Sequence, residues 1–220
     1  MTALLLALVA LQGPVDEGTL IVRQDTVEIA REAFRLTAAR SGAGWTLAST
    51  VRYDRTRPVV VLDPIVELGP DSNPTSLEYT VADPRAPLRI LGQLTRGRFM
   101  VRLLGRRTEH AREFPAPLPA AVLDDSVYGL YLPVAWFGGA RPGPVPVTAL
   151  FPRAGRREHL SVQDLGVEAT TLNRDPASLR HITATGGENR LVHVWVGGDG
   201  RLAKVEIPSR RLIVERQPAP

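Results

Sequence analysis

Hydrophobic and polar residues alternate along most of this chain, with the period of two that is typical of half-buried β-strands. The clearest example is the segment LVHVWVGGDGRLAKVEIP at residues 191–208. Within it, residues 192–196 alternate valine with His or Trp, and residues 203–207 alternate apolar residues with Lys and Glu. The Gly-Gly-Asp-Gly sequence between them allows the chain to reverse sharply. This segment therefore predicts a β-hairpin.

The same alternation recurs between residues 19 and 214, for example in residues 45–53 and 76–81. Dipeptides that favour turns, such as Gly-Pro, Asn-Pro and Asp-Pro, separate many of the apolar runs. The pattern predicts about eleven to thirteen short strands at spacings of roughly 8–12 residues, which is typical of a β-sandwich or a β-barrel. The fold class is therefore all-β and mainly antiparallel. Alternation alone does not distinguish stacked sheets from a curved barrel, because both use the same period.

One segment departs from this pattern. Residues 121–137, AVLDDSVYGLYLPVAWF, contain apolar residues at helical spacing. Asp124 is a candidate N-cap for this helix, and Pro133 is expected to end or kink it. The sequence therefore predicts one helical insertion among the strands.

The predicted helix is apolar on nearly all sides, so it should be buried on more than one side. Such a helix can cover a pocket for a hydrophobic ligand, or it can pack on a sheet as part of the core. Under the first interpretation, five apolar residues of this segment are the candidate ligand-binding residues. They are Val127, Tyr128, Tyr131, Trp136 and Phe137.

The chain begins with an uncharged apolar run at residues 3–11, ALLLALVAL. A membrane-spanning helix needs about 20 residues, so this run is too short to span a bilayer. It matches the apolar region of a secretory signal peptide, although no Lys or Arg precedes it. We expect residues 1–14 to be a signal peptide and residues 15–220 to be a single domain in the periplasm or outside the cell. A buried first strand or helix is the alternative.

Composition narrows the chemistry. The chain has no cysteine, which excludes disulfides, thiol catalysis and cysteine-bound metals. The formal net charge of +4 over 220 residues is too small to favour nucleic acid as a partner. Arg98 and Arg102 share one face of a predicted strand, where guanidinium groups can contact the phosphates of lipid head groups. A solvated strand face is the alternative for these two arginines.

Motifs for catalysis and metal binding are missing from the sequence. There is no Gly-x-Ser-x-Gly, no Ser-x-x-Lys and no phosphate-binding glycine loop. His110 lies between Glu109 and Glu113, but the two-histidine spacing of a helical metal site is absent. Asp124-Asp125 is better explained as the start of a helix than as a catalytic pair. We therefore expect no metal, no cofactor and no enzymatic activity.

The order of these features resembles a known superfamily. A short export signal, strands, an aromatic-rich helical insertion, further strands and the VWVGGDGRLAKVEIP hairpin resemble exported bacterial domains of the lipoprotein-carrier superfamily (LolA/LppX-like). The resemblance covers roughly residues 17–216 and extends to no binding motif of the carriers. It implies a curved, incomplete β-barrel with the helical insertion across its open side, an apolar cavity, and lipid binding.

Together these features predict a soluble envelope protein that binds a lipid or another hydrophobic ligand in a cavity of its curved sheet. One alternative is a non-catalytic scaffold or interaction module with an envelope protein as its partner. A second alternative is a hydrolase that uses carboxylates and histidines distant in the sequence.

Overall fold

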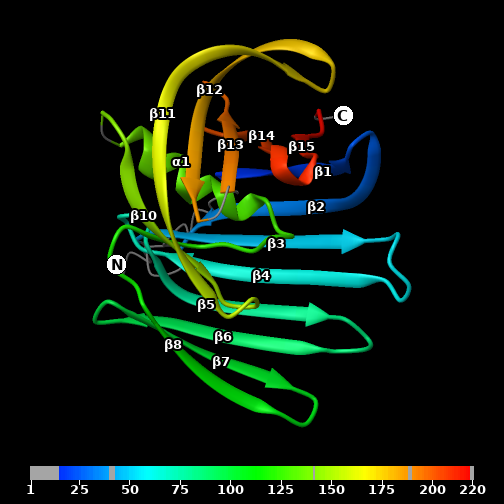
Figure 1. The fold of residues 1–220 in the computed structure, drawn as a ribbon, viewed down its shortest axis with the longest axis vertical. Helices are drawn as coiled ribbons and strands as arrows, with labels where there is room; N and C mark the ends of the chain where they lie inside the picture. The colour runs from blue at the N-terminus through cyan, green and yellow to red at the C-terminus, as the bar shows by residue number, and fades with distance from the viewer. Residues whose placement is uncertain (1–14, 40–42, 141, 188–189, 219–220) are drawn as a thin grey trace, which may run out of the picture.

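The computed structural model describes residues 15–39, 43–140, 142–187 and 190–218. The predicted signal peptide, residues 1–14, lies outside the described residues. The described chain forms one continuous sheet of fifteen strands, in which nearly every strand pairs antiparallel with its neighbours (Figure 1). The prediction of an all-β, mainly antiparallel fold is confirmed.

The strands follow one another along the chain. They are β1 (Asp16–Gln24), β2 (Val27–Ala38), β3 (Trp45–Tyr53), β4 (Val60–Leu68), β5 (Pro74–Ala82), β6 (Leu88–Thr95), β7 (Arg98–Gly105), β8 (Glu109–Pro115), β9 (Ala120–Val122), β10 (Val145–Phe151), β11 (Arg156–Leu172), β12 (Asp175–Gly186), β13 (Arg190–Val196), β14 (Leu202–Ile207) and β15 (Leu212–Arg216). Across the sheet the order is β8-β7-β6-β5-β4-β3-β2-β1-β15-β14-β13-β12-β11-β10-β9. The end strands β8 and β9 do not pair with each other, so the sheet is a curved, incomplete barrel.

Alternation explains why most of these segments form strands. In β5, the buried Leu77, Tyr79 and Val81 alternate with the exposed Glu78 and Thr80, so one face meets the core and the other meets water. The apolar rows of successive strands line the concave side of the sheet and form one main core.

The structure has fifteen strands in its described residues, whereas the sequence predicted about eleven to thirteen. Strand β8, EHAREFP, is exposed at every position except Phe114, so it has no apolar row to reveal it. Strand β9 has only three residues. Two strands are also longer than the predicted short strands, because β2 has 12 residues and β11 has 17. A bulge between Asp164 and Gly166 interrupts the alternation of β11 without ending the strand.

The predicted helical insertion is present, but it starts later than expected. A short 3₁₀ turn, η1 (Gly129–Tyr131), leads into α1 (Leu132–Gly139) on the concave side of the sheet (Figure 1). Asp124 is not the N-cap, because its carboxylate is paired with Arg153. Pro133 lies in the first turn of the helix and does not end it, because its fixed φ suits that turn and no intrahelical donor is lost there.

Strands β11 and β12 extend beyond the rest of the sheet as a long hairpin, which curls over the barrel (Figure 1). Asn173 and Arg174 make its two-residue turn, and both have the positive φ that such a turn requires. We call residues 165–180 the arm. Leu179 and the partly buried Leu172 of the arm pack with Trp195 and Ala203 to form a second, smaller core.

Candidate ligand-binding site

The five predicted ligand-binding residues lie in the main core. Val127 and Tyr128 are 0% exposed and Tyr131 is 1% exposed. Phe137 is also buried, and Trp136 is half-buried with its ring centroid 6.5 Å from that of Trp45. As they stand, these side chains fill the interior of the barrel. Their contact with a ligand stays a prediction.

A buried carboxylate fixes the start of this segment. Glu32 of β2 is 0% exposed, and the N–H groups of Tyr128 and Gly129 donate to its two carboxylate oxygens, each at 2.7 Å. Burial raises the pKa of Glu32 to about 7, and the two N–H donors only partly offset this effect. Sequence reasoning missed Glu32. The sequence feature that could have revealed it is a charged residue between Ala30 and Phe34, in the inward-facing row of a strand.

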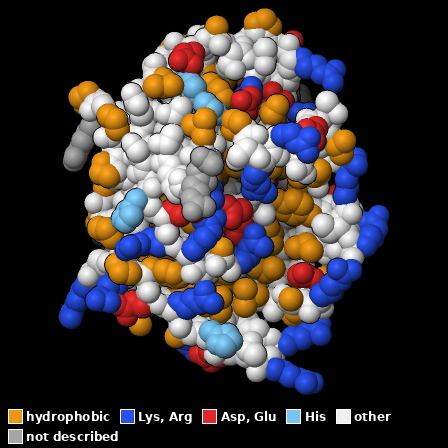
Figure 2. Space-filling model, viewed as in Figure 1, with side chains coloured by type: hydrophobic (Ala, Val, Ile, Leu, Met, Phe, Trp, Pro, Cys, Tyr) orange, Lys and Arg blue, Asp and Glu red, His pale blue; other side chains and the backbone are white. Residues whose placement is uncertain are grey.

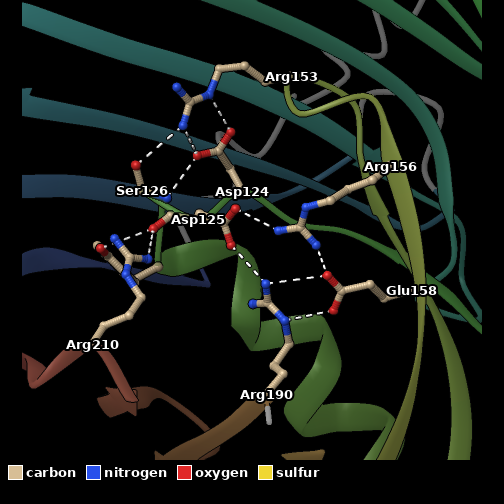
Figure 3. A network of polar contacts seen from close by, with 9 residues as sticks. Asp124, Asp125, Ser126, Arg153, Arg156, Glu158, Arg190 and Arg210 are labelled. Carbon is tan, nitrogen blue, oxygen red and sulfur yellow. Dashed lines mark hydrogen bonds and ion pairs between the residues drawn. The ribbon is translucent and has the colours of Figure 1, made fainter. Parts of the chain in front are cut away.

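A second anchor lies just before the 3₁₀ turn (Figure 3). The side chain of Arg153 donates two hydrogen bonds to the carboxylate of Asp124, both at 2.7 Å. The N–H of Ser126 donates to the same carboxylate at 2.8 Å. Asp124 is buried and Arg153 is about one-third exposed. This pair ties the segment to the turn between β10 and β11.

Asp125 belongs to a neighbouring network of ions (Figure 3). Arg156 and Arg190 donate to its two carboxylate oxygens at 2.6 and 3.1 Å. Burial alone would raise the pKa of Asp125, but the two arginines outweigh burial and hold it below its usual value. Glu158 pairs with both arginines, at 2.7 Å to Nε of Arg190. The guanidinium of Arg156 also lies over the ring of Phe151, 3.8 Å from the centroid. These charges satisfy one another and hold the insertion in place.

A separate hollow lies at the tip of the arm. We call it the arm groove, and its volume is about 1310 Å³. The arm tip, the β13–β14 turn and parts of β1, β2 and β3 surround it. Ala33 and Arg35 line it, and they alternate with the buried Glu32 and Phe34, so they point away from the main core. None of the five predicted ligand-binding residues lines this groove.

Small and apolar side chains form the floor of the arm groove, and ion pairs lie along its rim. Its apolar lining includes Ala33, Ala48, Leu172, Ala177, Leu179 and Ala203. On the rim, Arg35 lies 3.2 Å from Glu17, and Arg216 lies 2.8 Å from Asp16. Because these four charged side chains already have partners, a ligand in the groove does not need to neutralise them. A hollow of this size can hold a small molecule or a lipid chain.

Two histidines form a relay beneath the arm. Nδ1 of His181 lies 2.7 Å from Oε2 of Glu168, and Nε2 of His181 lies 2.9 Å from Nδ1 of His193. Where Nδ1 of His181 donates to the Glu168 carboxylate, Nε2 of a neutral His181 accepts from His193, and Nε2 of a protonated His181 donates to it. Burial and the neighbouring His181 lower the pKa of His193. His181 also stacks on Trp195, at 4.6 Å between centroids, so the relay is packed into the second core.

The remaining candidates lie apart. Arg98 and Arg102 project from β7, where Arg98 pairs with Glu113 and Arg102 pairs with Glu109 at 2.6 Å. Their contact with lipid head groups stays a prediction. His110 lies on the exposed strand β8. In the part of the chain that the structure describes, no cluster of three or more His, Asp or Glu side chains is arranged to hold a metal.

Comparison with known proteins supports the fold and leaves the site open. No protein-family model matches the chain, and no curated protein matches it. The structure is similar to the crystal structure of a beta-barrel-like protein of a domain of unknown function, DUF1849, from Brucella abortus. That similarity has a TM-score of 0.56 at 11% sequence identity and covers 91% of this chain and 93% of the other. The protein is thus of a β-barrel-like class, and the comparison contains nothing specific to the LolA/LppX carriers.

Among the residues described, no helix combines the length and the apolar character needed to cross a bilayer.

Proposed function

We propose that this protein is an exported, non-enzymatic binding protein whose ligand is a hydrophobic small molecule or a lipid chain. The observation that carries the proposal is the arm groove, about 1310 Å³ in volume, with its apolar floor and paired ionic rim. Export rests on the apolar run at residues 3–11. The barrel-like fold is compatible with ligand binding, and the filled interior favours the arm groove over the barrel core as the site.

The arm groove suits an apolar ligand for a physical reason. Each apolar contact that it offers removes hydrocarbon surface from water, at about 25 cal/mol per Å². The rim ion pairs lie beside this surface and need no new partner.

The test is uptake of N-phenyl-1-naphthylamine, an uncharged apolar fluorophore, together with native mass spectrometry of protein extracted with organic solvent. Ala33→Trp places a bulky ring in the arm groove, and Thr80→Trp places the same ring on the exposed face of β5 as a control. We expect Ala33→Trp to abolish uptake and any co-purifying apolar mass, while Thr80→Trp retains both.

Two results would count against the proposal. Loss of uptake in Trp136→Ala but not in Ala33→Trp would place the ligand inside the barrel, at the predicted aromatic residues. Failure of the wild-type protein to take up either the fluorophore or added phospholipid would reject ligand binding and favour the scaffold alternative.

A further inference from the structure

We infer that one edge of the sheet is a docking surface for an anionic lipid bilayer. The edge consists of three hairpin loops: β3–β4 at residues 54–59, β5–β6 at residues 83–87 and β7–β8 at residues 106–108. In an antiparallel sheet with sequential strands, every second loop lies at the same edge. We call these three loops the basic edge. Figure 2 shows blue side chains of Lys and Arg gathered down this side of the molecule, where the same loops turn in Figure 1.

The basic edge carries an excess of positive charge. It contains five exposed arginines, Arg55, Arg57, Arg85, Arg106 and Arg107, against two aspartates, Asp54 and Asp83. Asp54 is already paired with Arg52 at 2.5 Å. At the opposite edge of the same strands, the β4–β5 and β6–β7 loops carry one charge of each sign, Asp71 and Arg96.

These arginines are free of acidic partners. Among the described residues, no carboxylate lies within ion-pair distance of the five guanidinium groups. Three of them donate only to backbone oxygens: Arg57 to Asp54, Arg85 to Arg57, and Arg106 to Pro84. In contrast, Arg89, Arg98 and Arg102 on the neighbouring sheet face are each paired with a glutamate. The basic edge therefore presents unpaired charge, whereas these three arginines of the sheet face are neutralised by their partners.

The three loops follow one another along the sheet, so their charges form an extended row and not a single point site. At about 4.8 Å between strands, the row of tips extends about 20 Å. The three loops contain no aromatic residue to stack on nucleic acid bases, which favours a bilayer over a nucleic acid. Near an anionic bilayer each arginine strengthens binding by about fivefold.

The experiment measures co-sedimentation with vesicles of phosphatidylcholine mixed with phosphatidylglycerol, and with vesicles of phosphatidylcholine alone. The test variant combines Arg55→Gln, Arg85→Gln and Arg107→Gln, one substitution in each loop. The control combines Arg31→Gln, Arg89→Gln and Arg180→Gln, three exposed and ion-paired arginines outside the basic edge, which changes the net charge equally. We expect the test variant to lose on the order of 100-fold in binding to the anionic vesicles, and the control to stay within about fivefold of wild type.

Other outcomes would overturn the inference. An equal loss in both variants would indicate attraction by net charge alone. A test variant that binds like wild type would assign the contact to other arginines, such as the predicted Arg98 and Arg102. Equal binding to both kinds of vesicle, or binding that survives about 0.5 M NaCl, would exclude an electrostatic surface. Tighter binding to duplex DNA would assign the edge to nucleic acid. Displacement by inorganic phosphate at constant ionic strength would indicate a site for a free ion.

Discussion

Glu32 offers the sharpest test of how the barrel interior is held together. Its pKa is raised from 4.5 to about 7 in the folded protein, chiefly by burial. In the unfolded chain the carboxyl titrates at its usual value, so the unfolded state loses the proton first as the pH rises. The contribution of Glu32 to stability is therefore fully present below pH 4.5 and is lost as the pH rises through 7. The size of this loss is about 3 kcal/mol, at about 1.4 kcal/mol for each pKa unit.

The substitution Glu32→Gln removes this titration and keeps the shape of the side chain. At pH 4 the amide accepts only one of the two N–H hydrogen bonds, so the variant should be less stable than wild type by about 1–3 kcal/mol. Between pH 4 and pH 8 the wild type loses about 3 kcal/mol and the variant does not, so the difference between them should shift by about 3 kcal/mol in favour of the variant. Urea unfolding followed by tryptophan fluorescence at both pH values measures the difference. Glu78→Gln, at an exposed carboxyl on β5, serves as the control and should change stability by less than about 1 kcal/mol at either pH.

The reasoning would be refuted if the stability difference between wild type and Glu32→Gln were the same at pH 4 and pH 8. That result would mean that water or a local rearrangement solvates the carboxylate, so that burial does not penalise its charge.

Two further predictions concern the packing around the insertion and the sheet. Arg153→Ala leaves the buried Asp124 without its partner and should lower the free energy of unfolding by about 3 kcal/mol, whereas Arg98→Ala, which breaks an exposed pair, should cost less than about 1 kcal/mol. Equal losses in urea unfolding would contradict the structural role of the Asp124 pair. Gly92→Ala would place a Cβ atom 2.6 Å from the buried ring of Phe99 and should cost about 1–3 kcal/mol. Gly198→Ala meets no atom within 4 Å and should be nearly neutral, so a similar cost at both glycines would argue against close packing at Gly92.

The sequence predicted strands correctly where one face of the strand is buried and the other is exposed to solvent. Strand β5 shows this: its inward row of Leu77, Tyr79 and Val81 is visible as a period of two. It failed for β8, whose side chains are exposed on both faces apart from Phe114. The burial of the aromatic segment was also predictable, because a helix that is apolar on nearly all sides has no face suited to water.

The site was much less predictable, because it depends on contacts between distant residues. Asp124 meets Arg153, 29 positions along the chain, only because β9 pairs with β10 and the next turn brings Arg153 back. The arm groove depends on how far the β11–β12 hairpin curls past its bulge, which no local pattern specifies. The charge of an arginine is visible in the sequence, but whether it has a partner is decided by strand register. Arg98 is paired across β7 and β8, whereas Arg107, in the loop that joins them, is not.

The two proposed surfaces use different parts of strand β3. Strand β3 runs from Trp45 to Tyr53, and Tyr53 leads directly into the basic edge. The arm groove meets β3 at residues 48–50 and β1 at Glu17–Thr19, near the start of β1, and the arm tip and the β13–β14 turn complete it. Because no arginine of the basic edge lines the arm groove, uptake of an apolar ligand and binding to vesicles can be lost separately. Failure of one proposal would leave the other standing.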